Sequence, residues 1–385
     1  MKRRDPLPLE GITVADFSRV LAGPLCTQML GDAGARVIKV EEPNGGDETR
    51  RWGPPFVDGV SAYFLSVNRN KESLALNLKS AEGRAISRKL IERADVVVDN
   101  FLPAQRKALG VDSLGARVIH CSITGFDGDS PDADTPGYDL LAQAGSGLMA
   151  ITGDPDGEPA KVGVALADVL TAHYATSAIC AALFARERTG RGARIEISLF
   201  SAAIASLVNV AQNALVTGKE AKRHGNAHAS IVPYQLFHAS DRPFAIGAGT
   251  DRHFASLCRD VIGRDELSSD RRFATNAARV KNREVLIPLL ESIFAERRAS
   301  HWVSRCRKAG VPAAVVQGVR EALRSPAGRL LVVDVDHPDI GSYPAVLNPL
   351  MVSGKRFPIR IPPPALGQHT DAILRELGVN RRSPR

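Results

Sequence analysis

Strand patterns and helical patterns alternate through the first 126 residues, and this alternation restricts the fold of the chain more than any other feature. Short apolar runs predict strands at residues 11–17, 36–42, 73–79, 95–101 and 117–126, and longer periodic stretches predict helices at 22–35 and 81–94. Each helix must return the chain to the same edge of a sheet, so such chains form parallel sheets covered by helices. We therefore predict an α/β fold with a doubly wound parallel sheet.

The ends of three predicted strands are the expected place for a ligand. Ligands of such sheets bind beyond the carboxyl ends of the strands, which here carry residues 18–22, 100–101 and 124–126. The turn after the first strand lacks the G-x-G-x-x-G pattern, so the dinucleotide-binding fingerprint is absent.

Asp168 lies where a loop becomes a long apolar helix that ends at the Gly190 region and is followed by a strand over residues 194–200. One interpretation makes Asp168 an N-cap that accepts backbone N–H bonds from the first turn. A second makes it a carboxylate nucleophile that the helix dipole keeps ionised. The two are compatible. Residues 201–218 predict a further long apolar helix.

The chain has 385 residues, which suggests two domains or one domain with a large insertion. A polar stretch at 219–228 indicates a linker, and residues 229–325 indicate a smaller unit of strands and helices. The net charge of +8 is spread along the chain, which favours a small polyanion such as a coenzyme over nucleic acid.

Several classes of protein are not expected. No apolar run of about 18 residues predicts a membrane span, and the basic start has no apolar region of a secretory signal behind it. No metal-ligand spacing appears, so no metal is expected. The cysteines form no C-x-x-C motif and are expected to be buried free thiols in a reducing cytoplasm: Cys26, Cys121, Cys180, Cys258 and Cys306.

Other side chains carry two interpretations each. Tyr138 follows a Pro-Gly turn and is either a packing aromatic or a residue at a loop rim. The basic residues Lys79, Arg106 and Lys107 are either solvated or contacts for phosphate groups. No G-x-S-x-G elbow is present, which argues against a serine hydrolase.

The chain resembles the family III CoA-transferases, a group that includes formyl-CoA transferase, carnitine CoA-transferase and the 2-methylacyl-CoA racemases. The matching pieces run nearly end to end and include PLEGITVADFSRVLAGPLCTQMLGDAGARVIKVEEPNGGDETR, NRNKESLALNLKS, ADVVVDNF, SITGFDGDSPDADTPGYDLLAQAGSGLM, the Asp168 helix, RHGNAHASIVPYQLF and LGQHTDAILRELG. The resemblance implies a large Rossmann-like CoA-binding domain of residues 1–218 with 326–385, and a smaller α+β domain of residues 219–325 with its linkers. It also implies two interlocked chains in a homodimer.

The resemblance places the catalytic aspartate on Asp168. It places the coenzyme A contacts near Leu21, Ala22, Leu76, Asn77, Lys79, Asn100, Phe101, Leu102, Pro136 and Tyr138. Glu42 and Ala108 stand where some members have arginines for the CoA phosphates, and Arg106 and Lys107, or Arg50 and Arg51, are the expected substitutes.

The resemblance leaves transferase and racemase open. Racemases of this family carry a histidine directly before the Asp139 position, where this chain has Tyr138. A tyrosine hydroxyl, with a pKa of about 10, is a poor proton shuttle at neutral pH, so we predict a transferase that forms an aspartyl anhydride and then an aspartyl–CoA thioester on Asp168. The acceptor is expected to be a carboxylic acid, with succinyl-CoA a possible donor to a dicarboxylate held by Arg50, Arg51 or Arg223. A racemase, and a CoA-binding or nucleic-acid-binding protein without catalysis, are the alternatives.

Overall fold

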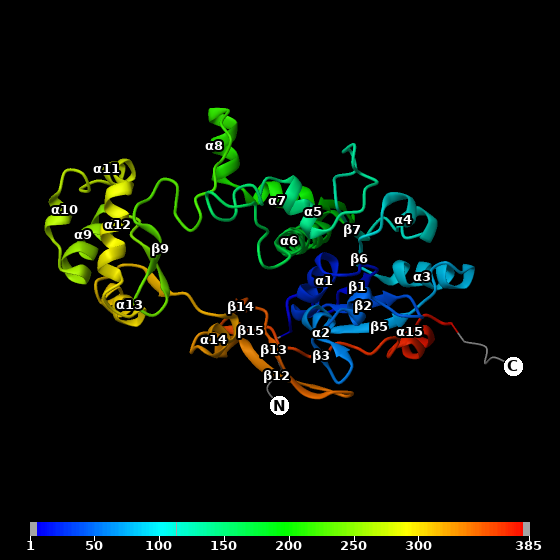
Figure 1. Cartoon of the computed structure of the whole chain (residues 1–385). Helices are drawn as coiled ribbons and strands as arrows, with labels where there is room; N and C mark the ends of the chain where they lie inside the picture. Colours follow the sequence, from blue (N-terminus) through cyan, green and yellow to red (C-terminus); the bar gives the residue numbers. More distant parts are fainter. Residues whose placement is uncertain (1–5, 113, 380–385) are drawn as a thin grey trace. The chain divides into compact units, whose positions relative to one another are not determined.

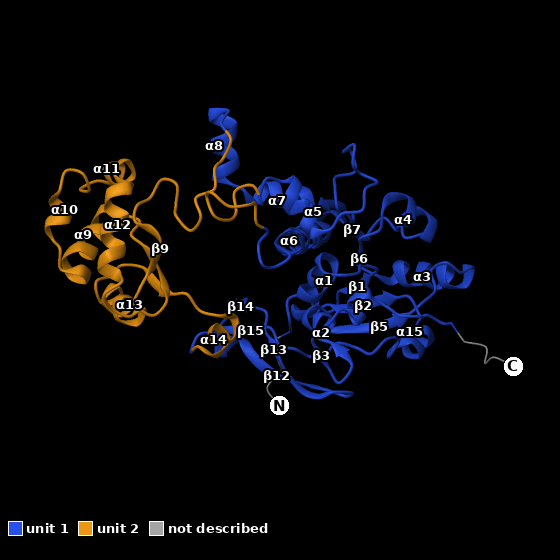
Figure 2. Ribbon diagram, in the orientation of Figure 1, with its two compact units in different colours: residues 1–149, 161–219, 326–385 blue, residues 150–160, 220–325 orange. Residues whose placement is uncertain are grey.

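The structure is a computed structural model and describes residues 6–112 and 114–379. These residues form two compact units (Figure 2): unit 1 combines residues up to 149 with 161–219 and 326 onward, and unit 2 combines 150–160 with 220–325. The sequence analysis placed residues 150–160 in the large domain, whereas in the structure they pack with unit 2. One reason is Arg223, whose guanidinium donates to the carbonyl oxygens of Ala150, Asp154 and Gly157.

Unit 1 is built on a six-stranded, fully parallel sheet in the order β5-β2-β1-β6-β7-β8. The strands are β1 (Thr13–Asp16), β2 (Arg36–Glu41), β5 (Lys71–Ala75), β6 (Val96–Asp99), β7 (Ile119–Thr124) and β8 (Arg194–Ser198). The chain builds β2 and β5 on one side of β1 and then crosses to β6 on the other side, so the direction of strand addition reverses between β1 and β6. The predicted doubly wound parallel sheet is confirmed.

Helices cover both faces of this sheet, as Figure 1 shows. Alternate strand residues divide between two cores: Val14 points to the face covered by α1, α6 and α7, and Ala15 points to the face covered by α3 and α15. The helices of unit 1 are α1 (Ala22–Asp32), α2 (Ala62–Val67), α3 (Ala81–Arg93), α4 (Pro103–Leu109), α5 (Asp139–Gly145), α6 (Leu166–Thr189), α7 (Leu199–Ser206), α8 (Asn209–Thr217) and α15 (Thr370–Glu376).

Residues 346–361 pack against the two residues that precede β5 in unit 1. The side-chain oxygen of Asn70 accepts the backbone N–H groups of Arg360 and Ile361 at 2.7 and 3.1 Å, and Arg69 donates to the carbonyl oxygen of Val346 at 2.8 Å. The C-terminal part of unit 1 also forms two small antiparallel pairs, β12 (Val332–His337) with β13 (Gly341–Val346) and β14 (Met351–Val352) with β15 (Lys355–Arg356). A third small antiparallel pair, β3 (Phe56–Val57) with β4 (Val60–Ser61), lies earlier in the chain.

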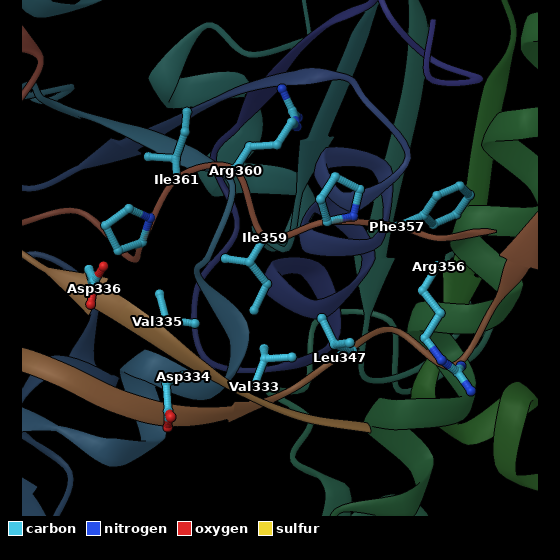
Figure 3. A pocket seen from close by; sticks show the side chains of 12 residues that line it. Val333, Asp334, Val335, Asp336, Leu347, Arg356, Phe357, Ile359, Arg360 and Ile361 are labelled. Atoms are coloured by element: carbon cyan, nitrogen blue, oxygen red, sulfur yellow. The ribbon is translucent and has the colours of Figure 1, made fainter. Parts of the chain in front are cut away.

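A hollow of about 480 Å³ lies beside the β12–β13 hairpin (Figure 3). The apolar side chains of Val333, Val335, Leu347 and Ile359 gather at its centre. Val333, Val335 and Ile359 also belong to the small hydrophobic cluster under this hairpin, so the hollow is the open side of a local core.

Unit 2 contains an antiparallel sheet of β9 (Tyr234–His238), β10 (Pro243–Gly247) and β11 (Ala313–Val315). Its helices are α9 (Asp251–Ser256) with a π-helical continuation (Leu257–Ile262), α10 (Glu266–Ser269), α11 (Asn276–Lys281), α12 (Arg283–Phe294), α13 (Ala299–Lys308) and α14 (Val319–Arg324). Phe294 is the centre of its core, with ring centroids 4.9 Å from Phe237 and 5.2 Å from Trp302.

Two predicted elements have other bounds in the structure, and one cysteine has another environment than predicted. The helix expected over 201–218 is divided into α7 and α8, bent by 79° at a break where Val208 has a φ of 44°. The strand expected at 73–79 begins earlier, at Lys71, and ends at Ala75, because its pairing with β2 stops there. Cys180 is exposed, whereas the other four cysteines are buried.

Among the described residues, α6 is long and apolar enough to cross a membrane, and the bent pair α7 and α8 passes the same test. The sequence analysis expected no such run. One third of the apolar window of α6 is buried, and Ala172, Ala175 and Ile179 are fully buried in the core that this helix shares with α1 and the sheet.

Candidate functional site

A cavity of about 210 Å³ lies beyond the carboxyl ends of β1, β6 and β7 in unit 1, next to the reversal point between β1 and β6. Ligands of open α/β sheets bind at such points. The turns that follow these strands supply most of its walls, and α6 contributes Asp168. The lining residues are Arg19, Val20, Ala22, Glu48, Asn100, Phe101, Leu102, Gln105, Ile123, Thr124, Gly125, Pro136, Gly137, Tyr138, Asp168 and Leu199.

Asp168 lies in the first turn of α6 and does not cap it. The residue at the N-cap position is Ala165, which has no side-chain cap, so the N-cap interpretation of Asp168 was wrong. Asp139 of α5 performs this role, because its carboxylate accepts the backbone N–H of Ala167 at 2.8 Å. The Asp168 carboxylate is therefore left free to face the cavity.

Asp139 is held in place by Gln143, one turn further along α5. The amide nitrogen of Gln143 donates to the Asp139 carboxylate at 2.7 Å, and its oxygen accepts the backbone N–H of Val162 at 2.9 Å. This bridge joins α5 to the loop before α6 and keeps a second carboxylate beside Asp168.

The environment of Asp168 raises its pKa to about 7. Burial is the largest cause, and the negative charge of Asp139 adds to it, while a hydrogen bond from the backbone N–H of Ala22 acts in the opposite direction. Ala22 is the first residue of α1, so two helix N-termini converge on this carboxylate. Their dipoles favour negative charge at this point.

Tyr63 of α2 lies in the same electrostatic environment. Burial, followed by the charges of Asp168, Asp47 and Asp139, raises its pKa to about 12. Its ring also makes an edge contact with Trp52, with centroids 5.2 Å apart. The Tyr63 hydroxyl is therefore neutral near pH 7. The sequence analysis missed this residue, because nothing in the sequence brings α2 near α6.

Two glycines form a tight contact in the wall of the cavity. A Cβ on Gly137 would lie 2.2 Å from the Cα of Gly125, and a Cβ on Gly125 would lie 2.4 Å from the Cα of Gly137. Only glycine allows the end of β7 to pass this closely under the segment that carries Tyr138. Tyr138 itself is 60% exposed, which fits a residue at the rim rather than a packed aromatic.

The cavity brings together seven of the predicted site residues: Asp168, Ala22, Asn100, Phe101, Leu102, Pro136 and Tyr138. The others lie outside its lining. Leu76 is buried in the core, and Asn77, Lys79 and Lys107 are exposed, while Leu21 precedes α1. The binding role of each of these residues stays a prediction.

Arg106 is buried and bonded to protein groups, with its guanidinium contacting the Asp99 carboxylate at 3.2 Å and the hydroxyl of Ser122. It therefore holds β6, β7 and α4 together, and its role as a contact for a CoA phosphate stays a prediction.

The arginines proposed for a distal carboxylate are also engaged. Arg50 pairs with Glu41 at 2.8 Å and stacks on the Phe64 ring, and Arg223 is bonded to carbonyl oxygens in unit 2. Arg51 is exposed and does not line the cavity. Arg19, which sequence reasoning missed, is the cation among the lining residues, and it pairs with Glu48 at 2.7 Å. Its position in the turn after β1 was the available signal.

Within residues 6–112 and 114–379, no cluster of histidine, cysteine, aspartate and glutamate side chains has the arrangement of a metal site. The charged side chains of the lining are Asp168, whose pKa is raised, and the ion pair of Arg19 and Glu48. This set suits covalent catalysis by a carboxylate.

Comparison with known proteins decides the family. The family model described as CoA-transferase family III matches residues 9–370. The chain belongs to this family of CoA-transferases. It is 43% identical to "Succinyl-CoA:glutarate CoA-transferase" of Mus musculus over 96% of this chain and 86% of that protein. It is 39% identical to "Succinate--glutarate CoA-transferase" of Agrobacterium fabrum over 100% of this chain and 98% of that protein.

A solved structure agrees. The crystal structure of a CAIB/BAIF family protein from Brucella suis superposes with a TM-score of 0.86 at 40% identity, covering 97% of this chain and all of that one. The resemblance seen in the sequence is confirmed, and the protein is an enzyme of the CoA-transferase class. The similar proteins named here are transferases, which favours transfer over racemisation.

Proposed function

We propose that this CoA-transferase moves CoA from succinyl-CoA to a second dicarboxylic acid, with Asp168 as the nucleophile. The observation that carries the proposal is a carboxylate placed at two helix N-termini in a cavity at the switch point of the sheet. The relatives named for succinyl-CoA and glutarate support the choice of substrates.

The first half of the reaction loads CoA onto the enzyme. An oxygen of Asp168 attacks the thioester carbonyl of succinyl-CoA, the C–S bond breaks, and CoA leaves as a thiolate. The thiolate then attacks the aspartyl carbonyl of the resulting anhydride, which releases succinate and leaves an aspartyl–CoA thioester. In the second half the acceptor carboxylate repeats these steps in reverse order. Each step exchanges two acyl groups of similar reactivity, so one difficult exchange becomes several easier ones.

The backbone around Asp168 fits the charge that develops in these steps. The Ala22 N–H, which bonds the Asp168 carboxylate in the free enzyme, faces the same oxygen when the carboxylate becomes an acyl group. A fixed N–H at a helix N-terminus stabilises an oxyanion without needing to reorganise. The raised pKa also makes Asp168 a more basic nucleophile than an ordinary aspartate.

Arg19 is the group we propose for the distal carboxylate of the acceptor. It lines the cavity with Asp168, and its side chain is 46% exposed while it pairs with Glu48. A planar guanidinium binds a carboxylate in a bidentate manner. The distal carboxylate of a bound dicarboxylic acid would therefore replace Glu48 as the ion-pair partner of Arg19.

The central test is detection of CoA on Asp168. We expect mass spectrometry of protein incubated with succinyl-CoA to find the CoA adduct on the peptide that contains Asp168. We expect Asp168→Ala to lose both adduct and transfer. Asp129→Asn, a change at an exposed loop carboxylate, is the matched control and should keep both. Transfer by Asp168→Ala at the wild-type rate would refute the proposal.

We also propose that two copies associate into the homodimer implied by the family resemblance. The end of α8 exposes Leu215 and Val216 by 80% and 75%, and none of the residues of this helix is buried. Phe184 on α6 is 67% exposed. Such apolar surface is typical of protein interfaces. Light scattering should give a molar mass twice that of one chain. The double variant Leu215→Glu with Val216→Glu should have the molar mass of a single chain.

A further inference from the structure

The turn that joins β1 to α1 has its backbone bonded at three successive residues by side chains from other parts of unit 1. The carbonyl oxygen of Ser18 accepts from the Lys39 ammonium at 2.9 Å. The Asn100 amide bonds both backbone groups of Arg19, at 3.0 and 2.8 Å. The backbone N–H of Val20 donates to the two carboxylate oxygens of Asp47 at 3.2 and 3.3 Å. The conformation of this turn is therefore set from outside it.

Val20 needs such external support. Its φ of 72° lies in the left-handed region, which branched side chains strongly disfavour. A strained residue of this kind persists only where surrounding contacts impose its conformation. Two residues later, Ala22 presents its N–H to Asp168.

The support comes from a buried ion pair. Lys39 and Asp47 are both fully buried and lie 2.8 Å apart. Thr49 donates its backbone N–H and its hydroxyl to the same Asp47 oxygen, at 3.0 and 2.7 Å. Burial opposes both charges, but the pairing keeps the pKa of Asp47 at about 2 and holds that of Lys39 above its usual value. Asp47 is therefore an ionised acceptor in a fixed position.

Stability alone does not account for this pair. Two charges moved out of water are expensive, and a buried ion pair often contributes less than apolar residues of the same volume. Asp47 has no place in the cavity lining, so it does not touch the substrates in the geometry described. Its contact with the site runs through the Val20 backbone.

We propose that Asp47, fixed by Lys39, is a positioning residue that holds Val20 in the left-handed conformation and thereby keeps the Ala22 N–H aimed at the Asp168 carboxylate. This inference rests on the proposed role of Asp168 as nucleophile. Asp47 acts on the chemical step, since a displaced donor weakens the stabilisation of each oxyanion and leaves the CoA contacts of the cavity in place.

The test uses Asp47→Asn, which keeps the size of the side chain and removes its charge. We expect kcat to fall by about 10- to 100-fold, as for small displacements of a catalytic group, with KM for succinyl-CoA changed by less than about threefold. The matched control is Asp32→Asn, which breaks another buried pair, Arg69–Asp32 at 2.7 Å, on a side chain that does not contact the turn. It should lower the melting temperature without lowering kcat.

A second variant separates positioning from general stability. Val20→Gly removes the strain, because glycine adopts positive φ freely. On the Asp47→Asn background this change should restore most of the lost kcat. Val20→Gly should not restore the melting temperature that Asp32→Asn loses.

Two results would overturn the inference: wild-type kcat in Asp47→Asn, or a double variant no faster than Asp47→Asn alone. Both are distinct from failure of the proposed function, which would appear as transfer by Asp168→Ala. A crystal structure of Asp47→Asn provides the direct readout, since the φ of Val20 should leave the left-handed region.

Discussion

Asp139 caps the helix on which Asp168 stands. Its carboxylate accepts the N–H of Ala167 at 2.8 Å, and its charge is one cause of the raised pKa of Asp168. The two carboxylates thus divide the tasks that the sequence assigned to one of them. Asp139 satisfies the helix N-terminus, and Asp168 keeps its oxygens for the cavity.

The pH dependence of catalysis should follow from this pair. In the proposed mechanism Asp168 must be ionised to attack a thioester, and its pKa is about 7, so kcat/KM for succinyl-CoA should fall about tenfold per pH unit below that value. Asp139→Asn keeps an oxygen for the Ala167 N–H but removes the negative charge. Its acidic limb should therefore move to lower pH, as measured from pH 5 to 9. A limb that stays in place or moves upward would contradict this assignment.

The same pKa predicts a cost in stability. A carboxyl group whose pKa is raised in the fold contributes stability that is present below its unfolded value, near 3.8, and is lost as the pH rises through about 7. Asp168→Asn should therefore unfold less readily than the wild type at pH 8, by about 1–3 kcal/mol, and the difference should vanish toward pH 4. Urea titrations at the two pH values measure it. The exposed control Asp129→Asn should show no such pH-dependent gain.

The glycine contact beneath Tyr138 should tolerate no side chain. Gly137→Ala places a Cβ 2.2 Å from the Gly125 backbone, so we expect a loss of about 1–3 kcal/mol together with reduced kcat/KM. Gly163→Ala is the control, because a Cβ there meets nothing within 4 Å. Equal melting temperatures for the two variants would show that the wall can move apart.

Arg19 should decide between dicarboxylates and monocarboxylates. Arg19→Gln should raise KM for glutarate by about tenfold or more, as expected for loss of a charged hydrogen-bonding partner, and should leave KM for a monocarboxylate acceptor of similar length unchanged. Glu48→Gln should lower KM for glutarate, because it releases Arg19 from its present partner at 2.7 Å. Arg51→Gln, at an exposed residue outside the lining, is the control. Equal effects of Arg19→Gln on both acceptor classes would assign Arg19 to another role.

Hydrophobic periodicity predicted the layers of unit 1 because burial on one face leaves a local pattern. The alternation of Val14 and Ala15 between two cores, for example, is a property of any strand between two layers of helices. The break at Val208 was not predicted, because apolar residues on both sides continue the helical period. The ion pair of Lys39 and Asp47 was not predicted either, since a buried lysine leaves no signal in the sequence.

The sequence by itself predicted the alternation of strands and helices in the first part of unit 1, the edge of the sheet that carries the cavity, and Asp168 as a candidate carboxylate there, because these follow from local patterns and from motifs carried by contiguous residues. Only the tertiary structure decided which charges are available there. Arg106 forms an ion pair with Asp99 and Arg50 forms one with Glu41, whereas Arg19 lines the cavity. The physical reason is that an ionic side chain acts through the partner it meets in space, and those partners come from strands and turns distant in the chain.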